Sequence, residues 1–170
     1  MEFSKLIEQR YSVRAYKSDP VEKEKLQQVL EAARLSPTAA NLQAYRLIVI
    51  QTKGREEELK RIYKPDWFTQ PPLVICVCAL PGETWVRKTD GKNFSDVDAS
   101  IVMTHIVLAA ANTGLGTCWI GAFDPDAARE ILGLPDDVEP AAFTPLGYPA
   151  DQLGPKRRKP LAELVHHERW

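Results

Sequence analysis

The spacing of hydrophobic residues divides the chain into helical and extended segments. Between Glu22 and Ser36 the apolar residues recur every three or four positions, which predicts an amphipathic helix that ends before Pro37. Short continuous apolar runs are typical of buried strands. Such runs occur at 45–51, 73–79, 117–120 and 141–146. Further helices are expected at 3–9, 54–63 and 124–133.

The longest predicted helix runs from Ser95 to about Thr113. Ser95 and Asp98 resemble a capping box in which Asp stands in for Glu. Apolar residues surround most of this helix, so we expect it to be central and buried. His105 lies within it and, without a carboxylate or cysteine at ligand spacing, is interpreted as a core or interface histidine. The order of elements predicts an α+β fold, with a mixed central sheet of about four to five strands and flanking helices.

Composition and charge exclude several classes of function. The chain has 170 residues, 44% of them hydrophobic and 26% charged, which fits one domain with a substantial core. Its formal net charge of −1 argues against general nucleic-acid binding, which requires a basic face. No basic start precedes an apolar run and no stretch approaches ~20 apolar residues, so neither a signal peptide nor a membrane span is expected.

The three cysteines are Cys76, Cys78 and Cys118. An odd number without zinc-like spacing indicates reduced thiols in a cytoplasmic protein and no metal site. Cys76 and Cys78 alternate along the predicted strand 73–79, so both should point to one face as buried thiols.

The first chemically distinctive group is Arg10, Ser12 and Arg14. In an extended segment these alternate side chains would all face one ligand. Arginine pairs bidentately with phosphate oxygens and serine adds a neutral donor, which suits a phosphomonoester. Alternatively, the arginines interact with the dipole of the preceding helix and otherwise lie in water. No glycine-rich phosphate loop is present, so side chains would have to hold a phosphate.

Two further segments carry candidate chemistry. The long irregular segment 81–94 is expected to be a lid or disordered, because such loops are uncommon in compact domains. Its aromatic residues would sandwich a flat substrate and its cations would attract an anionic one, although each Trp also fits core or interface packing. The expected substrate contacts here and in the loop before strand 73–79 are Trp67, Phe68, Trp85, Arg87 and Lys88.

Four motifs follow one another along nearly the whole chain. They are Arg10-Tyr11-Ser12-Val13-Arg14, Ser36-Pro37-Thr38-Ala39-Ala40-Asn41-Leu42-Gln43, Gly114-Leu115-Gly116-Thr117-Cys118-Trp119-Ile120-Gly121 and Lys156-Arg157-Arg158-Lys159-Pro160-Leu161. Each is weak alone, but in this order they resemble the nitroreductase-like family of FMN-dependent flavoproteins. The resemblance implies one domain over 1–170 and a homodimer with FMN at the subunit interface. The tail, about 150–170, would dock on the partner subunit.

The resemblance also implies roles for individual residues. Segment 10–14, with Lys156 and Arg158, would take the phosphate and ribityl region. The stretch 37–39 would meet the flavin from the partner subunit, and the amides of Asn41 and Gln43 would face the ring, although a loop amide also commonly bonds its own backbone. Backbone N–H groups of the turn 120–122 would approach the reactive nitrogen. The expected cofactor contacts are Arg10, Tyr11, Ser12, Arg14, Pro37, Thr38, Ala39, Asn41, Gln43, Ile120, Gly121, Ala122, Lys156 and Arg158.

The function implied by the resemblance is oxidoreduction with no catalytic side chain, because the flavin performs the chemistry. Electrons would pass from NAD(P)H to a flat, electron-poor small molecule, such as a nitroaromatic or a quinone, by a ping-pong hydride mechanism. An alternative is a flavin-binding or flavin-storage protein without significant turnover. A third interpretation assigns no ligand and leaves the basic residues as solvated surface.

Overall fold

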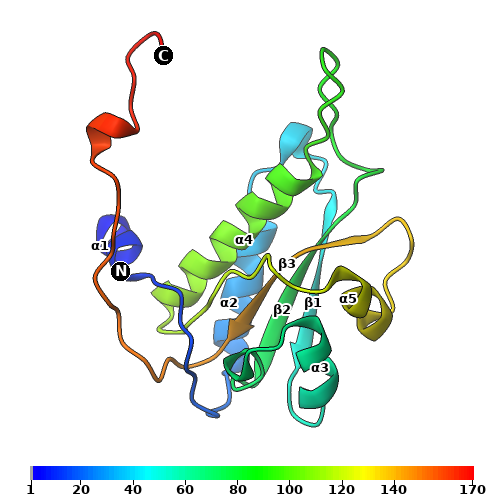
Figure 1. Cartoon of the computed structure of the whole chain (residues 1–170), viewed down its shortest axis with the longest axis vertical. Helices are drawn as coiled ribbons and strands as arrows, with labels where there is room; N and C mark the ends of the chain where they lie inside the picture. Colours follow the sequence, from blue (N-terminus) through cyan, green and yellow to red (C-terminus); the bar gives the residue numbers. More distant parts are fainter. Residues whose placement is uncertain (1) are drawn as a thin grey trace.

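Three antiparallel strands form the centre of the fold (Figure 1). The computed structural model describes residues 2–170. β2 (Leu73–Ala79) lies between β1 (Tyr45–Gln51) and β3 (Glu139–Leu146). β2 pairs with both neighbours in antiparallel register.

Residues 2–170 form five α-helices, of which four pack around this sheet and α1 lies apart from it beside the C-terminal segment (Figure 1), so the α+β class expected from the sequence is confirmed. Each α-helix and each of the three strands lies within about two residues of its predicted bounds. The helices are α1 (Phe3–Gln9), α2 (Lys23–Arg34), α3 (Glu56–Ile62), α4 (Ser95–Asn112) and α5 (Pro125–Leu132).

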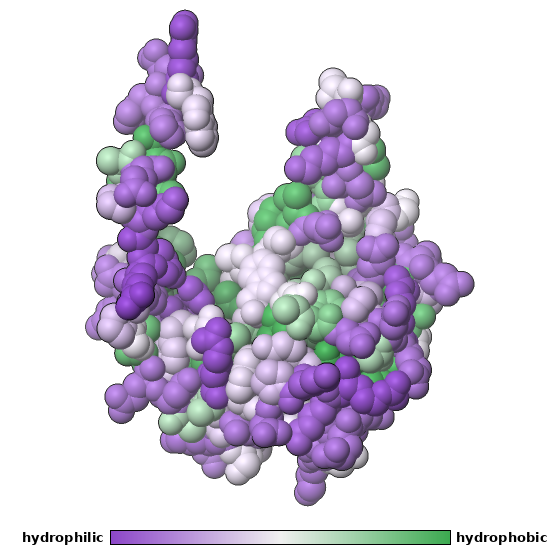
Figure 2. Space-filling view, in the orientation of Figure 1, coloured by the Kyte–Doolittle hydropathy of each residue, from purple (hydrophilic) through white to green (hydrophobic). Residues whose placement is uncertain are grey.

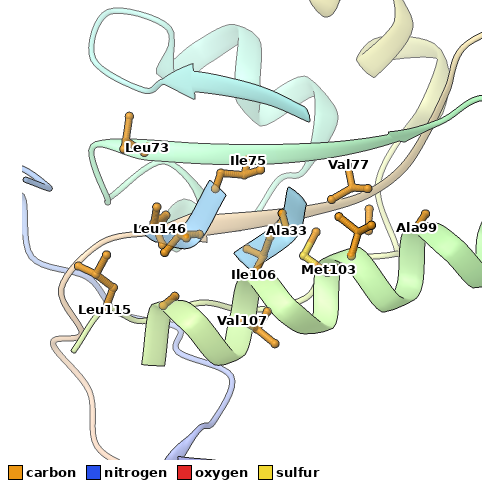
Figure 3. Close-up of a cluster of buried hydrophobic side chains, with 14 of the residues drawn as sticks. Ala33, Leu73, Ile75, Val77, Ala99, Met103, Ile106, Val107, Leu115 and Leu146 are labelled. Carbon is orange, nitrogen blue, oxygen red and sulfur yellow. The ribbon is translucent and has the colours of Figure 1, made fainter. Parts of the chain in front are cut away.

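β2 is buried along its whole length because helices cover both of its faces. Its odd-numbered residues, such as Ile75 and Val77, pack against α2 and α4 (Figure 3). Its even-numbered residues belong to a second cluster with α3 and α5. Cys76 and Cys78 lie in that second cluster with their sulfur atoms 3.6 Å apart, so their predicted placement as buried thiols on one face is confirmed.

The sheet differs from the expectation in its number and direction of strands. The predicted strand 117–120 makes only isolated bridges, parallel between Ser12 and Thr117 and antiparallel between Ile120 and Phe143. The N–H of Cys118, between these bridges, donates to the side-chain hydroxyl of Thr144, so the ladder does not continue. The sheet therefore has three strands and is antiparallel, not mixed.

The predicted capping box of α4 is wrong. Ser95 is the first helical residue, and the N-cap residue Phe94 makes no side-chain cap hydrogen bond; instead, the side-chain oxygen of Asn93 accepts the N–H of Ser95 at 2.9 Å. The carboxylate of Asp98 is buried and accepts the N–H of Ala39 at 2.9 Å and, more weakly, the hydroxyl of Thr84 at 3.4 Å. Asp98 therefore ties the loop 37–43 and the base of segment 81–94 to the start of α4.

α4 is buried on one side only. Ile106 and Met103 are buried and face the sheet (Figure 3). Thr104 is exposed and His105 is partly exposed, and both line an open groove. His105 Nδ1 lies 3.0 Å from the carbonyl oxygen of Ile101, within the same helix. The expectation of a buried helix is thus corrected for this outer side, where Arg10 lies beside Thr104 and Leu108 but Val97, Ser100 and Ile101 line the open groove.

Two segments project from the body of the molecule (Figure 1). Segment 81–94 is a ribbon closed by a bridge between Val86 and Asn93. The C-terminal arm, defined here as residues 151–170, passes α1 and continues away from the sheet. Among residues 2–170, no helix has the length and apolar character needed to cross a membrane.

One close approach fixes the segment after α1 against the body. The N–H of Val13 donates to the carbonyl of Thr117 at 2.9 Å, and Val13 is buried. A Cβ atom on Gly116 would lie 2.8 Å from a methyl group of Val13. Only glycine therefore lets these two segments lie together.

We predict that Gly116→Ala lowers the free energy of unfolding by about 1–3 kcal/mol, the usual effect of overpacking a rigid buried contact. Urea denaturation monitored by circular dichroism measures this change. Gly82→Ala is the matched control, because a Cβ atom there would meet nothing within 4 Å. Equal losses in the two variants would contradict the packing argument.

Candidate functional site

A cleft of about 580 Å³ lies between segment 10–14 and the first part of the C-terminal arm. It brings together predicted site residues from opposite ends of the chain. Those that line it are Arg10, Tyr11, Ser12, Arg14, Lys156 and Arg158.

Backbone pairing on both walls of the cleft explains why these distant segments meet. Val13 is buried between the alternating residues that line the cleft, as expected for an extended segment. The N–H of Lys17 donates to the carbonyl of Tyr148, and the N–H of Ala150 donates to the carbonyl of Ala15. These bonds hold the residues that follow β3 beside the segment after α1. The arm, which begins at residue 151, therefore starts next to the cleft.

The cleft is strongly cationic. Burial, followed by the nearby charges of Arg10 and Arg158, lowers the pKa of Lys156 below its ordinary value. The Lys156 ammonium also donates to the carbonyl of Ile7 at the end of α1. Arginine and lysine donors converging on one cleft are suited to a phosphate dianion, which offers many acceptor lone pairs.

Asp151 is a cleft residue that the sequence interpretation missed. Its carboxylate accepts the N–H of Arg14 at 2.8 Å and the hydroxyl of Tyr11 at 3.0 Å. The Tyr11 hydroxyl also lies 2.9 Å from the carbonyl oxygen of Asp151. The Tyr11 hydroxyl therefore points to the arm. No local sequence pattern links Tyr11 to Asp151, because they lie 140 residues apart in the chain.

The turn 120–122 follows the segment whose Thr117 pairs with Ser12 and Val13. Ile120 is buried and exchanges two backbone hydrogen bonds with Phe143. Gly121 and Ala122 follow it at the surface, with open space around the Gly121 Cα. None of the three residues lines the cleft, so the role that the resemblance implies for this turn stays a prediction.

The loop 37–43 lies at the other end of α4 (Figure 1). Ala40, Asn41 and Gln43 all have positive φ, between 52° and 55°, which is uncommon outside glycine. The Gln43 side-chain amide donates to the carbonyl oxygen of Asn41 at 3.2 Å and lies 3.4 Å from the Asn41 side-chain oxygen, so the two amides of the loop contact each other.

The separation of the two halves follows from the length of α4. The loop contacts Asp98, whereas Ala111 lines a pocket with Arg10. Arg10 also lies beside Thr104, so its neighbours on α4 are six to thirteen residues beyond Asp98, which corresponds to about 9–20 Å along the helix. No residue of the loop lines the cleft. A single chain therefore does not bring the loop to the cationic cleft.

The expected substrate residues are also divided. Trp67 lies on the cleft side, with its ring 6.0 Å from the Arg14 guanidinium carbon. Phe68 is fully buried against Tyr63 and Phe143, so its predicted contact with substrate is corrected: the short helical turn Asp66–Phe68 directs it into the core.

The other expected substrate residues lie on the projecting ribbon, at the end of α4 that holds loop 37–43. The ring of Trp85 meets that of Phe94 edge to face at 4.9 Å. Arg87 forms an ion pair with Asp90, and Lys88 is exposed.

The open side of α4 forms an apolar groove of about 460 Å³. Figure 2 shows apolar surface in the hollow between the arm and the ribbon. The groove is lined by Asp96, Val97, Ser100, Ile101, Thr104 and His105. Within residues 2–170, no three His, Cys, Asp or Glu side chains are placed to hold a metal ion.

Comparison with known proteins identifies the family. A sequence profile of the nitroreductase family matches residues 7–65 and 60–148. The chain belongs to the nitroreductase family. This nitroreductase-family chain is 30% identical to the FMN reductase (NAD(P)H) of Bacillus subtilis, over 99% of the chain and 74% of that protein.

Other relatives agree with this assignment. An NADPH-dependent oxidoreductase of Staphylococcus epidermidis is 27% identical, over 97% of the chain and 72% of that protein. The crystal structure of a nitroreductase family protein from Clostridium difficile 630 superposes with a TM-score of 0.89 at 41% identity. That match covers 100% of both chains, which confirms the expected family and fold.

The contact between Tyr11 and Asp151 predicts an unusual titration. Burial, then the hydrogen bond to Asp151 and its charge, raise the pKa of Tyr11 from 10.0 to about 12. The neutral phenol is the favoured form, so this hydrogen bond should persist above pH 10.0 and be lost as the pH rises through about 12. The near-ultraviolet titration of the wild type minus that of Tyr11→Phe should give this midpoint. A difference curve centred at 10.0 would contradict the contact.

Proposed function

We propose that this nitroreductase-family protein is a homodimeric FMN-dependent oxidoreductase, which passes electrons from NAD(P)H to a flat, electron-poor small molecule. The observation that carries the proposal is the cationic cleft built from both ends of the chain. This cationic cleft is suited to the phosphate, which is the one charged group of FMN. The names of the Bacillus subtilis and Staphylococcus epidermidis relatives support the same cofactor and electron donor.

The residues of the cleft would hold the phosphate and orient the rest of the cofactor. Arg10, Arg14 and Arg158 offer planar donor sets, and Ser12 adds a hydroxyl. The exposed backbone at Gly121 leaves space for a ring to approach, and an N–H donor there would stabilise negative charge. Bound FMN would supply the hydride chemistry, in two successive half-reactions with NAD(P)H and the acceptor.

The separation of the two halves along α4 supports a shared site. In a two-fold dimer, each subunit would present its loop 37–43 and ribbon to the partner's cleft. The apolar groove on α4 offers a surface for such packing. The arm adds exposed apolar residues, with Leu161 74% and Leu164 60% exposed, which we infer are covered by the partner subunit.

The acceptor would lie over the exposed face of the ring. Trp67 from the cleft half, and Trp85 with Arg87 and Lys88 from the ribbon half, would surround a flat molecule there. The three free cysteines support a reducing compartment, and we infer a cytoplasmic location.

We predict that the purified protein binds FMN and that NADH or NADPH bleaches its visible flavin absorption under anaerobic conditions. Addition of an acceptor such as a quinone should then restore the absorption. A flavin that binds but resists reduction would favour storage, and a protein that does not bind FMN would refute the proposal.

The same preparation tests the cleft. Arg10→Ala and Arg158→Ala should each weaken FMN binding by about 1.5–3 kcal/mol, the scale of a hydrogen bond to a charged group. Isothermal titration calorimetry measures this loss. Arg129→Ala removes a guanidinium from α5, outside the cleft, and should leave FMN affinity unchanged.

A further inference from the structure

The arm leaves the body of the molecule at Asp151. Backbone pairing with the segment after α1 ends at Ala150, whose N–H donates to Ala15. Among the described residues beyond that point, the backbone–backbone hydrogen bonds stay within the arm, as between Leu164 and Leu161. The placement of the cleft's second wall therefore depends on side chains.

Two side chains of the arm bond to the body near the cleft. Lys156 donates to the carbonyl of Ile7 at 2.9 Å. Asp151 makes the more extensive attachment. One carboxylate oxygen accepts the Arg14 N–H at 2.8 Å, and the Tyr11 hydroxyl is shared between the other carboxylate oxygen at 3.0 Å and the Asp151 carbonyl at 2.9 Å. These bonds join residues 137 and 140 positions apart, so they connect the two walls directly.

Asp151 is a carboxylate that lies among cations, yet its hydrogen-bond partners are neutral groups. Both oxygens are taken by a phenol and a backbone amide, and none of the ion pairs in residues 2–170 includes Asp151. The cationic groups of the cleft are thus left for a ligand. The carboxylate also offsets the mutual repulsion of those cations when they are brought together.

We propose that Asp151, held by Tyr11, is a positioning residue of the cleft. It latches the arm to segment 10–14 and so sets Lys156 and Arg158 opposite Arg10. The latch makes the cleft selective for a ligand with a phosphomonoester. This inference rests on the proposed function for the identity of that ligand, but the latch itself is a property of the chain.

The first test is limited proteolysis of the flavin-free protein with trypsin, which cuts after Lys156, Arg157 and Arg158. Tyr11→Phe and Asp151→Ala should speed cleavage of the arm several-fold without lowering the thermal midpoint. Tyr148→Phe is the matched control, because it also removes a tyrosine hydroxyl bonded to a carboxylate, that of Glu22, outside the cleft. Unchanged cleavage in both latch variants would overturn the proposal.

The second test compares FMN with riboflavin, which has the same ring and ribityl chain but no phosphate. Each latch variant should weaken FMN binding about tenfold, the scale of one hydrogen bond to a charged acceptor. In Asp151→Ala the riboflavin affinity should stay unchanged, as should both affinities in Tyr148→Phe. Calorimetry or flavin fluorescence measures both ligands.

The outcomes separate the latch from the proposed function. Equal losses for FMN and riboflavin in Asp151→Ala would indicate a general structural defect and overturn the latch. Tighter FMN binding in Asp151→Ala would mean that the carboxylate only repels phosphate, which also overturns it. A wild type that binds FMN no better than riboflavin would refute the phosphate assignment, while the proteolysis experiment would still decide whether the latch exists.

Discussion

A few backbone hydrogen bonds between residues 15–17 and 148–150 hold the two ends of the chain together. The rest of the candidate site depends on this pairing, because it places the arm beside segment 10–14. The cationic groups from the two ends then share one cleft, even though such proximity is unfavourable without a ligand. Backbone pairing up to Ala150 and the side-chain bonds of Asp151 and Lys156 beyond it thus enforce an electrostatically costly arrangement, which is what a preorganised anion site requires.

α4 is the second organising element, because it supports both loop 37–43 and the cleft and keeps them apart. Its buried side packs on the sheet, and its first turn holds loop 37–43 through Asp98. Its last turns lie near the cleft, next to Arg10. In the dimer that we propose, this helix would separate two half-sites, and its open apolar side would meet the second copy and bring complementary halves together.

Most of the fold could be predicted because its patterns are local. β2 is covered on both faces, so it reads as an uninterrupted apolar run, and Asp124 accepts two N–H groups of α5 as its sequence position suggests. The strand at 117–120 was overpredicted, because its partners supply only isolated bridges. Trp67 and Phe68 are adjacent and similar, and only tertiary packing decides that Phe68 lies in the core.

The cationic residues of the candidate site could be predicted from the sequence. The carboxylates that position the surrounding segments could not. Arginines and lysines in short motifs signal phosphate chemistry wherever they lie. Asp98 and Asp151 carry no such signal, because their partners are 59 and up to 140 residues away. Their roles emerge only when the chain is folded.

The central claim is that each site combines the cleft of one subunit with loop 37–43 of the other. Subunit complementation tests it most directly, using a cleft variant (Arg10→Ala with Arg158→Ala) and a loop variant (Ala39→Glu), each expected to lose FMN binding. Co-expression should restore about one quarter of the wild-type sites, because half of the dimers are mixed and each mixed dimer has one intact site. FMN binding that stays absent in the mixture, or an Ala39→Glu protein that binds FMN normally, would contradict the shared site.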